Sequence, residues 1–166
     1  GYWKDVGTLN SYWEANMELV DIIPEFNLYE EFWRIYTKSD ILPPQYIDED
    51  GIVVESIVGE GAEVYGEVNH CVIGSGVTIG KGAIIKDSII MNGTVIGEGA
   101  VINKAVIAEN VVIGNHVELG VGDEAPNDMA PHIYSFGLVT IGEGSTIPDN
   151  VKVGKNTAIF GPTTAE

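Results

Sequence analysis

The chain has 166 residues, enough for one domain or for one domain with an appendage. Its 25 acidic residues against 8 basic ones give a formal net charge of −17, which disfavours nucleic acid and anionic membranes as partners. The single cysteine, Cys71, cannot form a disulfide within the chain, and no apolar run approaches the roughly 20 residues that span a bilayer. We therefore expect a cytoplasmic protein.

Residues 1–22 are predicted to form the end of a strand followed by a helix over residues 9–20. Thr8 can cap this helix by accepting a backbone N–H of the first turn. Apolar residues recur at helical spacing, so one face must pack on the rest of the chain or on an upstream part. The residues of this face are Leu9, Tyr12, Trp13, Met17 and Val20. Because the chain opens on Gly1 in mid-motif, we expect it to be part of a longer protein.

Residues 23–51 are predicted to form an irregular connector that is rich in aromatic side chains. Pro43 and Pro44 favour an extended segment at its end. A turn is predicted at residues 48–51.

A six-residue repeat fills residues 52–166, interrupted by an insertion at 121–138. Each hexad opens with an aliphatic residue, and the residue two places earlier is never larger than valine. One opener recurs every seventeen residues, so three hexads make one coil with one short corner. The openers are Val58, Val64, Val68, Ile73, Ile79, Ile85, Ile90, Ile96, Ile102, Ile107, Ile113, Leu119, Ile141, Ile147, Val153 and Ile159.

This period is typical of a solenoid whose turns bury their aliphatic side chains against one another. An ordinary β-sandwich is the alternative, but it does not require small residues at fixed offsets. Gly or Asn often follows the opener, as at Gly97, Asn69 and Asn103, and we expect corners with positive φ there. Cys71 falls in the small inward register, which predicts a buried core thiol. The insertion is expected to form a loop on one face.

Four residues are candidates for chemistry. His70, His116 and His132 are weighed as the general base of an acyltransferase, but none has a carboxylate at a telling distance in the sequence. Asp5 has two interpretations, a turn-stabilising carboxylate or a hard oxygen ligand for Mg²⁺. No catalytic residue is assigned from the pattern alone.

Four segments in a fixed order resemble a known enzyme family. The hexads are similar to the hexapeptide repeat of left-handed parallel β-helices. The segments GYWKDVGTLNSYWEANMEL, WRIYT, LPPQYI and VIGSGVTIGKGAIIKDSIIM together resemble the C-terminal part of the glucose-1-phosphate adenylyltransferase family. The resemblance covers essentially the whole chain. It implies a mainly β fold, a left-handed parallel β-helix preceded by a short helix and an irregular connector.

The resemblance also implies a function. Members of the family join ATP and glucose 1-phosphate to give ADP-glucose and pyrophosphate for glycogen biosynthesis. It implies that Asp5 is one of two carboxylates that hold Mg²⁺, while the other site elements lie in an N-terminal domain. The β-helix is then the part for tetramer assembly and for regulation by a metabolite effector. A non-catalytic regulatory paralogue, which would form a hetero-oligomer, and a hexapeptide acyltransferase are the alternatives.

Overall fold

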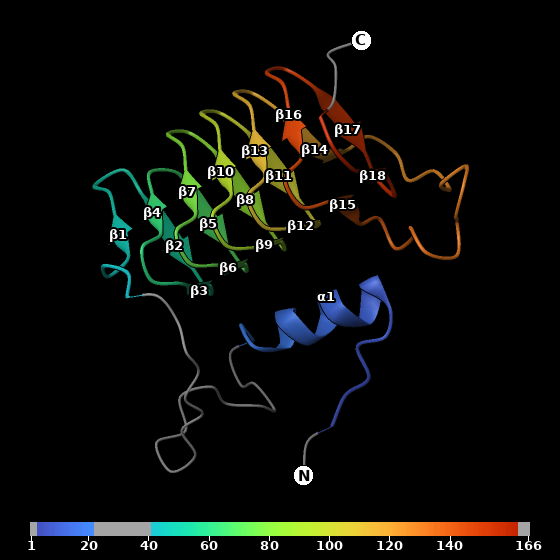
Figure 1. The fold of residues 1–166 in the computed structure, drawn as a ribbon, viewed down its shortest axis with the longest axis horizontal. Helices are drawn as coiled ribbons and strands as arrows, with labels where there is room; N and C mark the ends of the chain where they lie inside the picture. The colour runs from blue at the N-terminus through green and yellow to red at the C-terminus, as the bar shows by residue number, and fades with distance from the viewer. Residues whose placement is uncertain (1–2, 22–40, 163–166) are drawn as a thin grey trace.

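The β-strands of the computed structural model, which describes residues 3–21 and 41–162, form the three faces of a solenoid (Figure 1). All strand pairs in this part of the chain are parallel, and successive strands along the chain belong to successive sheets. One short helix, α1 (Leu9–Glu18), lies beside the solenoid (Figure 1). The fold is the predicted left-handed parallel β-helix.

Each sheet contains six strands. The first contains β1 (Tyr46–Ile47), β4 (Glu63–Val64), β7 (Thr78–Ile79), β10 (Val95–Ile96), β13 (Val112–Ile113) and β16 (Thr146–Ile147). The second contains β2 (Ile52–Val54), β5 (Glu67–Asn69), β8 (Ile84–Lys86), β11 (Val101–Asn103), β14 (Glu118–Val121) and β17 (Lys152–Gly154). The third contains β3 (Ile57–Val58), β6 (Val72–Ile73), β9 (Ile89–Ile90), β12 (Ala105–Ile107), β15 (Val139–Ile141) and β18 (Ala158–Ile159).

The core is a ladder of the predicted openers. Ile79, Ile96 and Ile113 are paired partners on neighbouring strands of the first sheet, and each is at most 1% exposed. The openers at the two ends, Val58 and Ile159, are partly buried and pack against the same cluster. Since fully burying one such side chain contributes about 1.5–3 kcal/mol, this ladder dominates the stability of the solenoid.

The glycines that follow the openers have a different role from the predicted one. Except for Gly120, none of them adopts positive φ. With the exception of Gly154, they are required by close approach instead: a Cβ on Gly97 would lie 2.5 Å from the backbone carbon of Gly114 in the next coil.

At most corners the left-handed residue stands three places after the opener, at Gly61, Gly76, Gly82, Gly93, Gly99, Asn110, His116, Gly144, Asn150 and Asn156. The expectation for Asn69 and Asn103 was also wrong, because the left-handed conformation falls on the residue after each of them. The turn is made beyond the strand end, and the coils stay in contact there, since the Gly99 N–H donates to the Lys81 carbonyl of the preceding coil at 2.9 Å.

The predicted short corner lies between the second and third sheets. In the first four coils the left-handed residue of this corner follows the inward aliphatic residue by only two places and is never glycine. The corner residues of successive coils are Glu55, His70, Asp87 and Lys104. The strand register stacks them in one column, which we call the corner column. The insertion leaves the solenoid at this same corner, after β14.

Helix α1 covers the outer face of the third sheet. Thr8 caps the helix as predicted, since its hydroxyl accepts the backbone N–H of Ser11 at 3.1 Å. Met17 is buried with Ile89 and Val106 of the third sheet. The apolar helix face therefore packs on the solenoid, which was one of the two partners expected.

The solenoid begins earlier than the predicted boundary at residue 52. Tyr46–Ile47 form β1 and pair with β4, so the end of the expected connector already belongs to the first coil. The predicted turn at 48–51 is confirmed by the hydrogen bond from the Gly51 N–H to the Asp48 carbonyl, 2.9 Å. Residues 22–40 of the connector lie outside the described residues.

The role of close approach can be tested with Gly97→Ala. We expect a loss of about 1–3 kcal/mol in the free energy of unfolding, because the new methyl group meets the backbone of the next coil. Gly154→Ala is the matched control. It also follows an opener, but its Cβ would meet only the Val121 carbonyl oxygen at 3.9 Å, so its stability should stay within about 1 kcal/mol of wild type. Chemical denaturation measures both, and equal losses would contradict this role for close approach.

Candidate functional site

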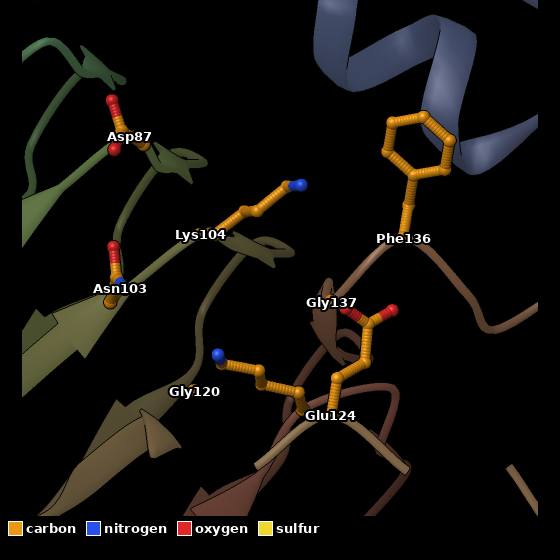
Figure 2. Close-up of a pocket in the computed structure, with 8 residues that line it drawn as sticks. Asp87, Asn103, Lys104, Gly120, Glu124, Phe136 and Gly137 are labelled. Carbon is orange, nitrogen blue, oxygen red and sulfur yellow. The ribbon is translucent and has the colours of Figure 1, made fainter. Parts of the chain in front are cut away.

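A polar pocket opens where the insertion leaves the short corner (Figure 2). Its volume is about 180 Å³. Lys104 and Asp87 of the corner column line one side, and Glu124 and Phe136 of the insertion line another. Lys155, which follows β17, completes it. Three segments that are far apart in sequence therefore meet at one site.

Lys104 contacts both α1 and the insertion. Its ammonium lies 5.0 Å from the ring centre of Trp13 on α1 and 4.9 Å from that of Phe136 on the insertion. Figure 2 shows its side chain extending from the solenoid toward Phe136. Each aromatic face attracts the cation through its quadrupole. Among the described residues, neither Lys104 nor Lys155 has a carboxylate oxygen within 4 Å, so both ammonium groups remain available to an anion.

Asn156 fastens the insertion to the last coil. This buried side chain is 4% exposed. Its Oδ1 accepts the Gly137 N–H at 2.7 Å, and its Nδ2 donates to the Ala125 carbonyl at 2.8 Å. Its own carbonyl accepts from the side chain of Asn127 at 3.0 Å. One residue therefore holds three points of the insertion.

Asp5 lies apart from the pocket. Its side chain is exposed, and Oδ1 accepts the Gly7 N–H at 3.0 Å, which is the turn-stabilising role weighed above. Among residues 3–21 and 41–162, no three His, Cys, Asp or Glu side chains are grouped closely enough to hold a metal ion. An exposed carboxylate on a turn fits a magnesium site only as one oxygen ligand among others.

The three histidines lie in different surroundings. His70 belongs to the corner column, and its Nδ1 lies 2.7 Å from Asp87 Oδ1. His116 is an exposed left-handed corner residue whose ring faces Gly99 of the neighbouring coil. His132 is exposed on the insertion and faces Thr8 across a second hollow.

Cys71 is a core thiol, as predicted. It is fully buried, and burial raises the pKa of its thiol to about 12. A thiol this basic is almost entirely protonated at neutral pH and is a poor nucleophile. In the described part of the chain, no helix is long and apolar enough to cross a membrane.

The pocket was not predicted from the sequence. Lys104 and Lys155 are 51 positions apart, and only the coil register and the path of the insertion bring them together. The sequence offered one signal for the pocket, the small number of basic residues. Lys104 and Lys155 are two of only 8 in an acidic chain.

The fold and the repeat define a hexapeptide-repeat β-helix. A family model described as GlmU-like, C-terminal hexapeptide matches residues 43–141. The chain belongs to this family.

Three curated relatives carry the same name. It is 68% identical over all 166 residues to a glucose-1-phosphate adenylyltransferase of Lachnospira eligens. It is 45% identical over 166 residues to that of Acetivibrio thermocellus, and 56% identical over 159 residues to that of Thermotoga maritima. The chain spans 38–39% of the length of these relatives and matches their C-terminal part.

The role of Asn156 can be tested with Asn156→Ala. We expect the free energy of unfolding to fall by about 1–3 kcal/mol, because the Gly137 N–H is left buried without an acceptor. Asn150→Ala is the matched control, since Asn150 is also left-handed but exposed. Limited proteolysis should cleave the insertion faster in the first variant than in the second. Equal cleavage rates would show that Asn156 does not hold the insertion.

Proposed function

We propose that this chain is the assembly and regulatory region of a cytoplasmic, Mg²⁺-dependent glucose-1-phosphate adenylyltransferase that acts in glycogen biosynthesis. The observation that carries the proposal is the 68% identity over the whole chain to a protein of that name. In the reaction, a phosphate oxygen of glucose 1-phosphate attacks the α-phosphorus of ATP, and pyrophosphate leaves. The products are ADP-glucose and pyrophosphate.

In the proposed enzyme, Asp5 contributes one carboxylate oxygen to the metal, and a second carboxylate comes from the upstream part. The metal offsets the negative charge that develops on the phosphates. The turn around Gly7 fixes the direction of the Asp5 side chain, and the cap at Thr8 joins this turn rigidly to α1. Because α1 packs on the third sheet, the solenoid supports the position of the carboxylate.

Asp5→Asn in the full-length enzyme tests the metal role. The amide keeps the acceptor for the Gly7 N–H but removes the charge, so the fold should be kept. We expect the rate of ADP-glucose formation to fall by about a hundredfold or more. We also expect the variant to bind Mg²⁺ more weakly than the wild-type enzyme does. Asp50→Asn, at an exposed turn, is the control. Unchanged turnover of Asp5→Asn would refute the role of Asp5.

The two alternative functions give different outcomes. A full-length wild-type protein without adenylyltransferase activity, active only as a partner subunit, would identify the non-catalytic paralogue. Turnover of acetyl-CoA would identify an acyltransferase. The surroundings of the three histidines favour neither, since the one with a close carboxylate, His70, also faces α1.

We further propose that the pocket at Lys104 and Lys155 binds an anionic metabolite effector. Two of the 8 basic residues of this acidic chain line it, beside the carboxylates of Asp87 and Glu124. An anion on Lys104 competes with the rings of Trp13 and Phe136, so binding would change the contacts of α1 and of the insertion together. We also propose that the full-length protein is a homo-tetramer, on the strength of its resemblance to the family.

Lys104→Gln and Lys155→Gln test the effector pocket. Inorganic phosphate and a set of sugar phosphates are titrated into the chain by calorimetry, and the same compounds are assayed as activators or inhibitors of the full-length enzyme. We expect each substitution to weaken binding about tenfold or more, since each removes one charge-assisted contact. Lys81→Gln, at an exposed position, should bind normally. Equal affinity in all variants would place the effector elsewhere.

A further inference from the structure

The corner column contains four bulky residues in a conformation that usually belongs to glycine. The φ angles are 45° at Glu55, 54° at His70, 48° at Asp87 and 51° at Lys104. Strained backbone of this kind persists where the surrounding structure uses it. Here it turns one polar side chain per coil outward along one line, and three of the four meet α1 or the residues that follow it.

His70 lies between two carboxylates on different elements. Its Nδ1 is 2.7 Å from Asp87 Oδ1 on the neighbouring corner, and its Nε2 is 3.5 Å from Asp21 Oδ1, just beyond α1. The ring is about one quarter exposed, so it is partly shielded from solvent. Asp87 also holds α1 directly, because its carbonyl accepts the indole N–H of Trp13 at 2.7 Å.

The charge of His70 determines what it can offer to Asp21. In the neutral ring, the short contact to Asp87 requires the proton on Nδ1, since a carboxylate is only an acceptor. Nε2 then presents a lone pair to the carboxylate of Asp21, which is unfavourable. In the imidazolium both nitrogens donate, and the ring bridges the solenoid and the end of α1.

We propose that His70 is a proton-dependent latch between the solenoid and the end of α1. Imidazoles change charge between about pH 5 and 8, so docking of α1 is tightest on the acid side and weakens as the pH rises. The corner residue on the other side of His70 in the column, Glu55, is also acidic. The nearest corner cation is Lys104, two coils away. The inference concerns docking alone and does not depend on the proposed reaction.

The indole N–H of Trp13 reports on the latch, because it donates to the backbone of the corner column. Its hydrogen-exchange protection factor is measured by NMR on the ¹⁵N-labelled chain at several values between pH 5.5 and 8. Protection factors are used because they remove the intrinsic effect of pH on exchange. We expect protection to be about two- to fivefold greater at pH 5.5, the effect of one partly exposed ion pair.

Two variants separate the latch from other causes. His70→Gln should make the protection factor of Trp13 independent of pH. Asp21→Asn keeps the contact between His70 and Asp87 and should reduce the dependence, so it remains informative if the first variant folds poorly. His132→Gln is the control, because His132 faces the first turn of α1 across the second hollow. A wild-type profile that is flat with pH would overturn the proposal, as would a dependence that survives in His70→Gln or disappears in His132→Gln.

Discussion

The close stacking of one aliphatic residue per face is the constraint on which the rest of this structure depends. Ile79, Ile96 and Ile113 lie in register on neighbouring strands, and a glycine follows each where the next coil approaches within contact distance. A slip of one residue would turn these side chains to solvent. The ladder therefore fixes which residues of successive coils lie above one another, including residues that take no part in the core.

The corner column is the consequence of that register. Because the corner between the second and third sheets is a residue short, the left-handed residues His70, Asp87 and Lys104 follow their openers by two places and not by three. Charged residues at these positions cost backbone strain, of order 1–2 kcal/mol each. In return, these corner residues form a column that contacts α1 through Asp87 and Lys104. The strained corner residues thus carry the contacts that hold the helix.

The sequence alone predicted the parts of the fold that depend on periodicity. The openers, the seventeen-residue coil, the short corner and the cap at Thr8 all follow from spacing and residue type, and all were confirmed. The role of the glycines was misassigned because a small residue satisfies both a left-handed turn and a close approach. Only the path of the neighbouring coil distinguishes the two, as at Gly97.

The site was predictable to a much smaller extent. Asn156 meets Ala125 and Gly137 through the folded insertion, and no local pattern marks such contacts. The pairing of His70 with Asp87 has the coil repeat of seventeen residues, so it follows from the register once the left-handed corner is known. The contact with Asp21 does not, because it depends on how α1 docks.

The short corner is also the only one of the three from which this chain's described residues send out a long insertion. A left-handed corner on the outside of the solenoid can be opened without disturbing the inward ladder, and Gly120 is left-handed where the insertion begins. The insertion then returns over the same column and places Phe136 against Lys104. The helix and the insertion therefore share one contact residue, so a change in the surroundings of Lys104 acts on both. Because Lys104 lies outside the inward ladder, its contacts with the helix and the insertion involve none of the buried openers of the core.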